Sequence, residues 1–108
     1  MKYALYIDYK KDGKYEYIDL SSSDLEEAIE AADELVELKG GNEAVYLARI
    51  MKKVGKITAP EKGLKQATFE AILCKRSQGW HRNTKENCES EHIATRTSDK
   101  YGAWYEAV

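Results

Sequence analysis

The chain has 108 residues, of which 43% are apolar and 33% are charged, and its formal net charge is −2. This is the composition of an ordinary globular protein, which excludes a disordered chain, and no run approaches the roughly 20 apolar residues that span a bilayer. The length is typical of one domain, so we expect a single domain over residues 1–108. An export signal is not recognisable at the N-terminus and two cysteines are too few for a disulfide framework, so we expect a cytoplasmic protein with no membrane partner.

Charge is distributed unevenly along the chain. Residues 1–50 contain six basic and twelve acidic side chains, whereas residues 51–108 contain eleven basic and seven acidic ones. Such asymmetry indicates either a charged partner or two halves that face each other.

The first twenty residues predict a β-hairpin. Aromatic and aliphatic side chains recur at every second position from Tyr3 to Tyr9, which predicts a strand with Tyr6 on its opposite face. Asp12-Gly13 is a tight-turn dipeptide, and residues 15–20 are the expected returning strand.

A helix is expected over residues 23–39. Ser23 and Glu26 have the spacing of a capping box, and Gly40-Gly41 is a typical helix end. One apolar stripe at helical spacing should lie against a sheet. Its members are Leu25, Ala28, Ile29, Ala32, Leu35 and Val36.

The rest of the chain alternates strand-forming and turn-forming segments. We expect a strand at 44–54, a loop at 55–66, a strand at 67–75 with Phe69, Ala71 and Leu73 on one face, a turn-rich segment at 76–90, and short closing strands at 92–97 and 103–108. The order ββαββ, extended by a C-terminal hairpin, predicts the α+β class. We expect an antiparallel sheet of four to six strands with one amphipathic helix packed on one face.

The polar face of the expected helix is almost purely acidic. Its residues are Glu26, Glu27, Glu30, Asp33, Glu34 and Glu37. Three pairs four residues apart are like-charged, which costs about 1 kcal/mol at most in local repulsion. A row of carboxylates can imitate a phosphate backbone and occupy a basic groove of another protein, whereas the simplest alternative is a solvated face that aids solubility. A third reading pairs the acidic face with the basic second half across a homodimer.

Tyrosine is abundant, with eight residues, and those left exposed would suit a protein interface. We count Tyr6, on the opposite face of the first strand, with the acidic helix residues as partner-binding. The leading hypothesis is a small non-enzymatic regulator or inhibitor that docks on a basic, nucleic-acid-binding protein. Its size also suits an anti-defence protein of a phage or mobile element.

Two basic segments, 52–65 and 75–85, support the alternative of a nucleic-acid-binding accessory protein. Basic side chains with an interleaved aromatic residue can follow a backbone and stack a base. The residues concerned are Lys52, Lys53, Lys56, Arg76, Trp80 and Arg82. If 44–54 and 67–75 form a hairpin, however, its eight-residue strands hold the two segments roughly 27 Å apart.

Every cysteine and histidine of the chain falls within nineteen residues, and two thiolates with two imidazoles would complete a tetrahedral zinc site. The four are Cys74, His81, Cys88 and His92. Their spacing is not that of a recognised zinc motif, so we expect no cofactor, with structural zinc as the minor alternative. The chain also has no phosphate-binding glycine loop, nucleophile elbow or HExxH motif, so we expect no enzymatic activity.

Overall fold

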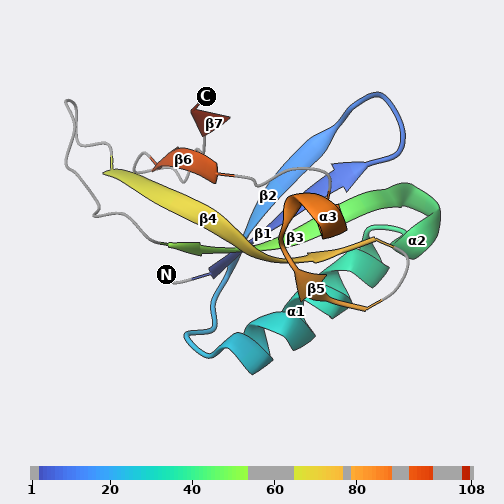
Figure 1. Ribbon diagram of the computed structural model, residues 1–108, viewed down its shortest axis with the longest axis horizontal. Helices are drawn as coiled ribbons and strands as arrows, with labels where there is room; N and C mark the ends of the chain where they lie inside the picture. Colours follow the sequence, from blue (N-terminus) through green and yellow to red (C-terminus); the bar gives the residue numbers. More distant parts are fainter. Residues whose placement is uncertain (1–2, 54–64, 77–78, 89–92, 99–105, 108) are drawn as a thin grey trace.

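The computed structural model describes residues 3–53, 65–76, 79–88, 93–98 and 106–107 (Figure 1). The strands are β1 (Tyr3–Tyr9), β2 (Tyr15–Leu20), β3 (Val45–Lys53), β4 (Lys65–Lys75), β5 (His81–Arg82), β6 (Ile93–Ser98) and β7 (Glu106–Ala107). The helices are α1 (Leu25–Leu38), α2 (Gly41–Ala44) and α3 (Lys85–Cys88). No helix in these ranges has the length and apolar character needed to cross a membrane.

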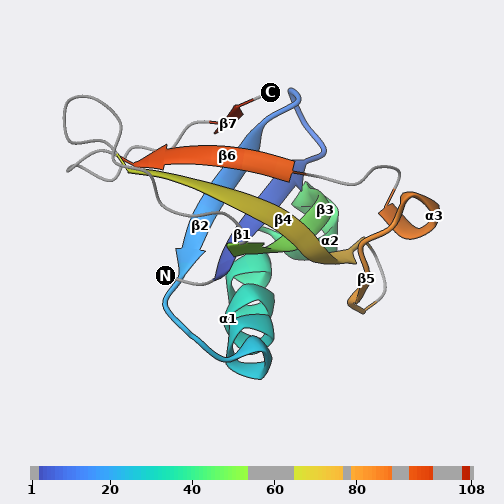
Figure 2. The same ribbon diagram turned by 60° about the vertical axis from the view of Figure 1, so that its left-hand side comes forward.

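The sheet consists of five longer strands in the order β2-β1-β3-β4-β6, all antiparallel to their neighbours. The two-residue strands β5 and β7 add to β4 and β6. Helix α1 lies on one side of this sheet, where it contacts β1, β2 and β3, and strands β4 and β6 run side by side (Figure 2). The predicted α+β class is confirmed, with one helix longer than a single turn among the described residues.

The predicted hairpin is confirmed. Strands β1 and β2 pair antiparallel, in a register that begins with Tyr3 opposite Leu20 and ends with Asp8 opposite Tyr15. Asp12 and Gly13 have φ angles of 63° and 59°, the left-handed values that an Asp-Gly turn adopts readily. This turn is closed by the Lys14 amide, which donates to the Lys11 carbonyl at 3.4 Å.

The start of α1 differs from the predicted capping box. Asp24 is the N-cap, since its backbone is extended and its carbonyl accepts from the Ala28 amide at 2.9 Å. Ser22, not Ser23, supplies the hydroxyl, which accepts from the Asp24 amide at 3.1 Å and donates to the Glu27 carboxylate at 2.9 Å. These bonds stabilise the turn that leads into α1, but no side chain caps the helix itself, so the predicted capping box of Ser23 and Glu26 does not form.

The predicted apolar stripe of α1 is confirmed: Ala28, Ala32 and Val36 are buried against one face of the sheet, with Leu25, Ile29 and Leu35 packed around them. At the C-terminal end, Gly40 has a φ of 110°, and a Cβ there would lie 2.6 Å from the Ala44 Cβ. Only glycine satisfies both conditions, so this residue lets the chain turn from α1 into α2.

A β-bulge in β4 overturns the expected strand alternation. Ile50 pairs with Leu73 but Met51 pairs with Ala71, so Ile72 is an extra residue. As a result Ile72 and Leu73 both pack against the helix-side core, whereas Phe69 and Ala71 belong to a second core on the opposite face. Leu73 therefore does not share a face with Phe69, because the inserted residue reverses the alternation.

Candidate functional site

Five glutamates form the outer face of α1, and we call them the acidic ridge: Glu26, Glu27, Glu30, Glu34 and Glu37. All five are exposed. Among the residues that the structure describes, none of them is ion-paired with a lysine or arginine. As far as the described residues show, the ridge is therefore a row of negative charge without basic ion-pair partners, and its field extends into solvent over about a Debye length.

Asp33, the sixth predicted ridge residue, is engaged within the fold. Its Oδ1 accepts from Lys75 Nζ at 3.0 Å and from Trp80 Nε1 at 2.9 Å. The Lys75 ammonium also lies 5.8 Å from the centre of the Trp80 ring. Asp33 thus joins the middle of α1 to the end of β4 and to the segment before β5, and it is less available to a partner than its neighbours.

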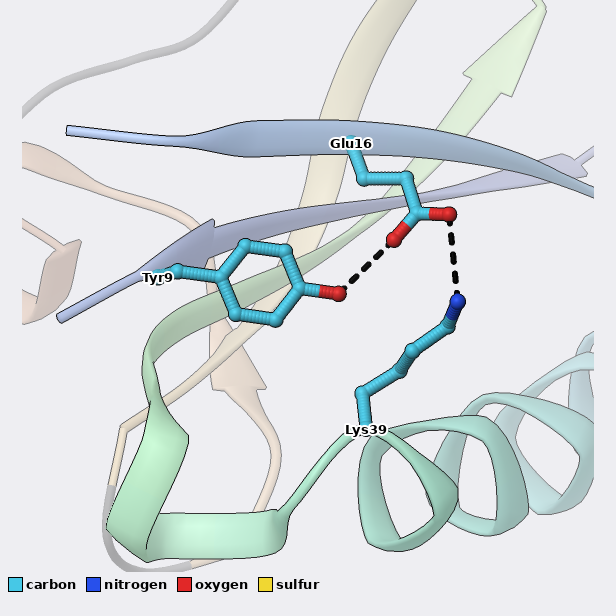
Figure 3. A network of polar contacts seen from close by, with 3 residues as sticks. All are labelled: Tyr9, Glu16 and Lys39. Atoms are coloured by element: carbon cyan, nitrogen blue, oxygen red, sulfur yellow. Dashed lines mark hydrogen bonds and ion pairs between the residues drawn. The ribbon is translucent and has the colours of Figure 1, made fainter. Parts of the chain in front are cut away.

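A second polar network joins the C-terminal end of α1 to the hairpin (Figure 3). Glu16 of β2 accepts from the Tyr9 hydroxyl at 2.7 Å and from Lys39 Nζ at 3.2 Å. Burial raises the pKa of Tyr9 to about 12, and the hydrogen bond and negative charge of Glu16 add to the shift. Lys39 is the nearest basic residue to the ridge in sequence, yet its charge is directed away, toward the hairpin.

An exposed leucine lies at the C-terminal end of the ridge. Leu38 is 80% exposed, which is high for a large apolar side chain. It lines a shallow depression with Asp33, Glu34 and Glu37. The combination of an apolar side chain with flanking carboxylates could anchor a partner that presents both apolar and basic groups.

Tyr6 does not join this surface. It is only 8% exposed and belongs to the core on the sheet face opposite α1. Its ring centre lies 5.0 Å from that of Tyr17 and 6.0 Å from that of Tyr15, and the Arg49 guanidinium lies 5.5 Å from it. Of these three tyrosines, Tyr15 is the one that is largely exposed, at 53%.

The basic residues of the alternative hypothesis are separated. Lys52 and Lys53 lie in β3 and are half-buried, and Lys56 lies outside the described residues. Since Lys53 pairs with Phe69, Arg76 is roughly 20 Å further along β4. The two groups are therefore separated as predicted, although by less than the roughly 27 Å expected.

At that far end of β4, Arg76 and Arg82 are exposed and Trp80 is half-buried. The Trp80 ring packs against the helix-side core while its N–H binds Asp33. An aromatic ring held in this way is a poor platform for a nucleic-acid base, which needs an open ring face.

The two cysteines are joined in a disulfide, Cys74–Cys88, which the sequence did not predict. While this bond holds, neither sulfur is a thiolate that could bind zinc. His81 is exposed, and His92 lies outside the described residues. Within the described ranges, no three cysteine, histidine or acidic side chains are grouped closely enough to hold a metal ion.

Arg49 is a structural residue that the sequence reading overlooked. It is 5% exposed, and it donates to Asn83 Oδ1 at 3.3 Å and to the Cys88 carbonyl at 3.2 Å. With the disulfide, these bonds hold residues 79–88 against the sheet. A charged residue inside the apolar run of 45–51 was the available signal.

Comparison of the chain with protein-family models, with curated proteins and with solved structures gives no match.

Proposed function

We propose that this protein is a non-enzymatic binding protein, a regulator or inhibitor that docks on a basic surface of another protein through the acidic ridge. The observation that carries the proposal is the state of its five glutamates, which are exposed and not ion-paired with any described lysine or arginine. A helix face that served only solubility would gain from mixed charges, because pairs of opposite sign stabilise a helix and like pairs destabilise it.

Two further features support a docking role. Exposed Leu38 offers an apolar contact beside the carboxylates, and such anchors supply much of the affinity in protein interfaces. The apolar stripe of α1 packs on the sheet, and the links of Asp33 to Lys75 and of Glu16 to Lys39 add polar contacts between them. A preorganised surface loses little conformational entropy on binding. A basic nucleic-acid-binding protein is the partner class that fits this charge best.

The alternative, a nucleic-acid-binding accessory protein, has weaker support. Its basic residues are divided between the two ends of the β3–β4 pair, and Trp80 is engaged with Asp33.

The predicted cytoplasmic location belongs to the proposal as well. The Cys74–Cys88 disulfide provides a test of this location, because both cysteines would be free thiols in a protein kept in a reducing compartment. An origin in a phage or mobile element stays a prediction.

The test compares a ridge variant, Glu30→Lys/Glu34→Lys/Glu37→Lys, with a control that makes the same change of charge elsewhere. The control is Glu43→Lys/Glu70→Lys/Glu86→Lys, at three exposed positions off the ridge. Both should fold, as judged by circular dichroism and thermal unfolding. Each protein is used to capture partners from a cell lysate, and the affinity of any captured protein is then measured at two salt concentrations.

The proposal predicts a protein bound by the wild type and the control but not by the ridge variant, with affinity that falls as salt is added. Equal binding by all three proteins would show that the ridge is only a solvated face. Capture of nucleic acid alone, with steep salt dependence, would favour the alternative.

A further inference from the structure

One segment of the chain lies against the sheet but buries little of itself. We call residues 79–88 the strap; it contains β5 and α3 and lies beside the end of β4 (Figure 2). Two of its side chains, Asn83 and Cys88, are buried, and Trp80 and Thr84 are half-buried. The other strap residues are exposed. A segment that buries so little apolar surface belongs to the part of a fold that opens most readily.

Polar contacts join the strap to the sheet. The Asn83 amide donates to the Ile72 carbonyl at 3.1 Å. Arg49 of β3 donates to Asn83 Oδ1 and to the Cys88 carbonyl. The Asn83 Nδ2 group is buried but has no acceptor among the described residues, so it adds nothing to the attachment. A strap that opened would exchange these hydrogen bonds for bonds to water, so their net contribution to the attachment is small.

The disulfide is the covalent part of the attachment. Cys74 lies in β4, which pairs with β3 and β6, and Cys88 is the last residue of the strap. The bond closes a loop with a sequence separation of 14. Closing a loop of this length favours the attached state by roughly a hundredfold, because the chain has less freedom to lose. Cys74 is 1% exposed and Cys88 is 0% exposed, so a reductant reaches the bond only during a local opening of the strap.

We propose that the strap is a redox switch, which is closed on the sheet while the Cys74–Cys88 bond holds and opens when a dithiol reduces that bond. A thiolate of the dithiol attacks one cysteine sulfur, and the S–S bond breaks to release the other sulfur as a thiolate, which takes a proton from water. The second thiol of the dithiol then displaces the mixed disulfide, so the dithiol is oxidised to a cyclic disulfide and both cysteines become thiols. The same exchange in reverse closes the strap.

Opening of the strap changes the surface beside α1. Cys88 packs with Leu47 and Cys74 in a small core cluster, so these two residues lose part of their cover. Trp80 leaves the helix-side core and no longer donates to Asp33. Reduction therefore adds a less engaged carboxylate to the acidic ridge. Only this last consequence rests on the proposed docking function, whereas opening of the strap depends on contacts within the chain and is measured without a partner.

The experiment compares backbone NMR order parameters of the oxidised protein and of the protein reduced with dithiothreitol, with the redox state checked by mass after alkylation. The reporters are the strap amides, including that of Asn83, which is bonded to Ile72 while the strap is closed. The internal controls are the amides of Leu5 and Ile7, in a strand that is paired on both sides. The variant Cys74→Ala/Cys88→Ala should resemble the reduced protein and should not respond to dithiothreitol.

Reduction should lower the order parameters of the strap amides from about 0.85, the value of a rigid backbone, to below about 0.6. Leu5 and Ile7 should keep their chemical shifts and order parameters, and reoxidation should restore the strap. A strap that stays ordered after reduction, or is already mobile in the oxidised protein, would overturn the proposal. Loss of the native shifts of Leu5 and Ile7 on reduction would also overturn it, because the bond would then hold the whole fold together.

Discussion

The contacts of Asp33 with Lys75 and Trp80 allow a quantitative test of how α1 is held on the sheet. Replacing Asp33 with alanine removes the ion pair to Lys75 and leaves Trp80 Nε1 without its acceptor. The side chains of the ion pair are 45% and 21% exposed, so it contributes only about 0.5 kcal/mol. The hydrogen bond from Trp80 to a charged acceptor adds about 1.5 kcal/mol. We expect Asp33→Ala to lower the free energy of unfolding by about 2 kcal/mol.

Urea unfolding measures this change, and thermal unfolding should show a midpoint lower by roughly 10 °C for a domain of this size. Asp33→Asn keeps an oxygen that can accept from Trp80, so its loss should be about half as large. Glu34→Ala is the matched control, because its exposed carboxylate has no ion-pair partner among the described residues. It should change stability by no more than about 0.5 kcal/mol.

A double-mutant cycle with Trp80→Phe isolates the hydrogen bond, because phenylalanine keeps an aromatic ring but loses the indole N–H. The coupling energy between Asp33→Ala and Trp80→Phe should be about 1.5 kcal/mol. A coupling near zero, or a Glu34→Ala loss as large as that of Asp33→Ala, would refute the reasoning.

Three further predictions concern other parts of the fold. In an alkaline absorbance titration, the wild type should show a tyrosine that ionises near pH 12, and Tyr9→Phe should lose this step. Because this pKa lies above the unfolded value near 10, the contribution of Tyr9 to stability is present below pH 10 and is lost as the pH rises toward 12. Reducing the Cys74–Cys88 bond should lower the free energy of unfolding by about 3 kcal/mol, for a bond with a sequence separation of 14, and urea unfolding of the Cys74→Ala/Cys88→Ala variant should not respond to reductant. Gly40→Ala should lower the thermal midpoint by an amount equivalent to about 1–3 kcal/mol, whereas Gly79→Ala should have little effect because a Cβ there meets nothing within 4 Å.

The local elements were predictable because their signals are local. Alternation from Tyr3 to Tyr9 and the Asp12-Gly13 turn define the hairpin without help from the rest of the chain. The apolar stripe of residues 25–36 likewise determines which side of α1 is buried. In each case the side-chain period of 2 or 3.6 residues carries the information, so the exposed row of glutamates could be identified too.

Contacts between distant segments were not predictable from these periods. The bulge at Ile72 depends on how β4 pairs with β3, and it reverses the faces of the residues that follow. Tyr6 was expected at an interface, but it is buried because the sheet has a second core on the face away from α1. Alternation assigns a side chain to a face, but it does not show whether that face is covered.

The sequence by itself determined the class of fold, the helix and its acidic outer face, since these follow from periodicity and charge along a continuous segment. Only the tertiary structure decided which acidic residue is engaged, because Lys75 and Trp80 reach Asp33 from more than forty positions away. It also decided that the two cysteines meet and that Arg49 contacts Asn83. Such proximities arise from strand order and register, which no short segment of the chain encodes alone.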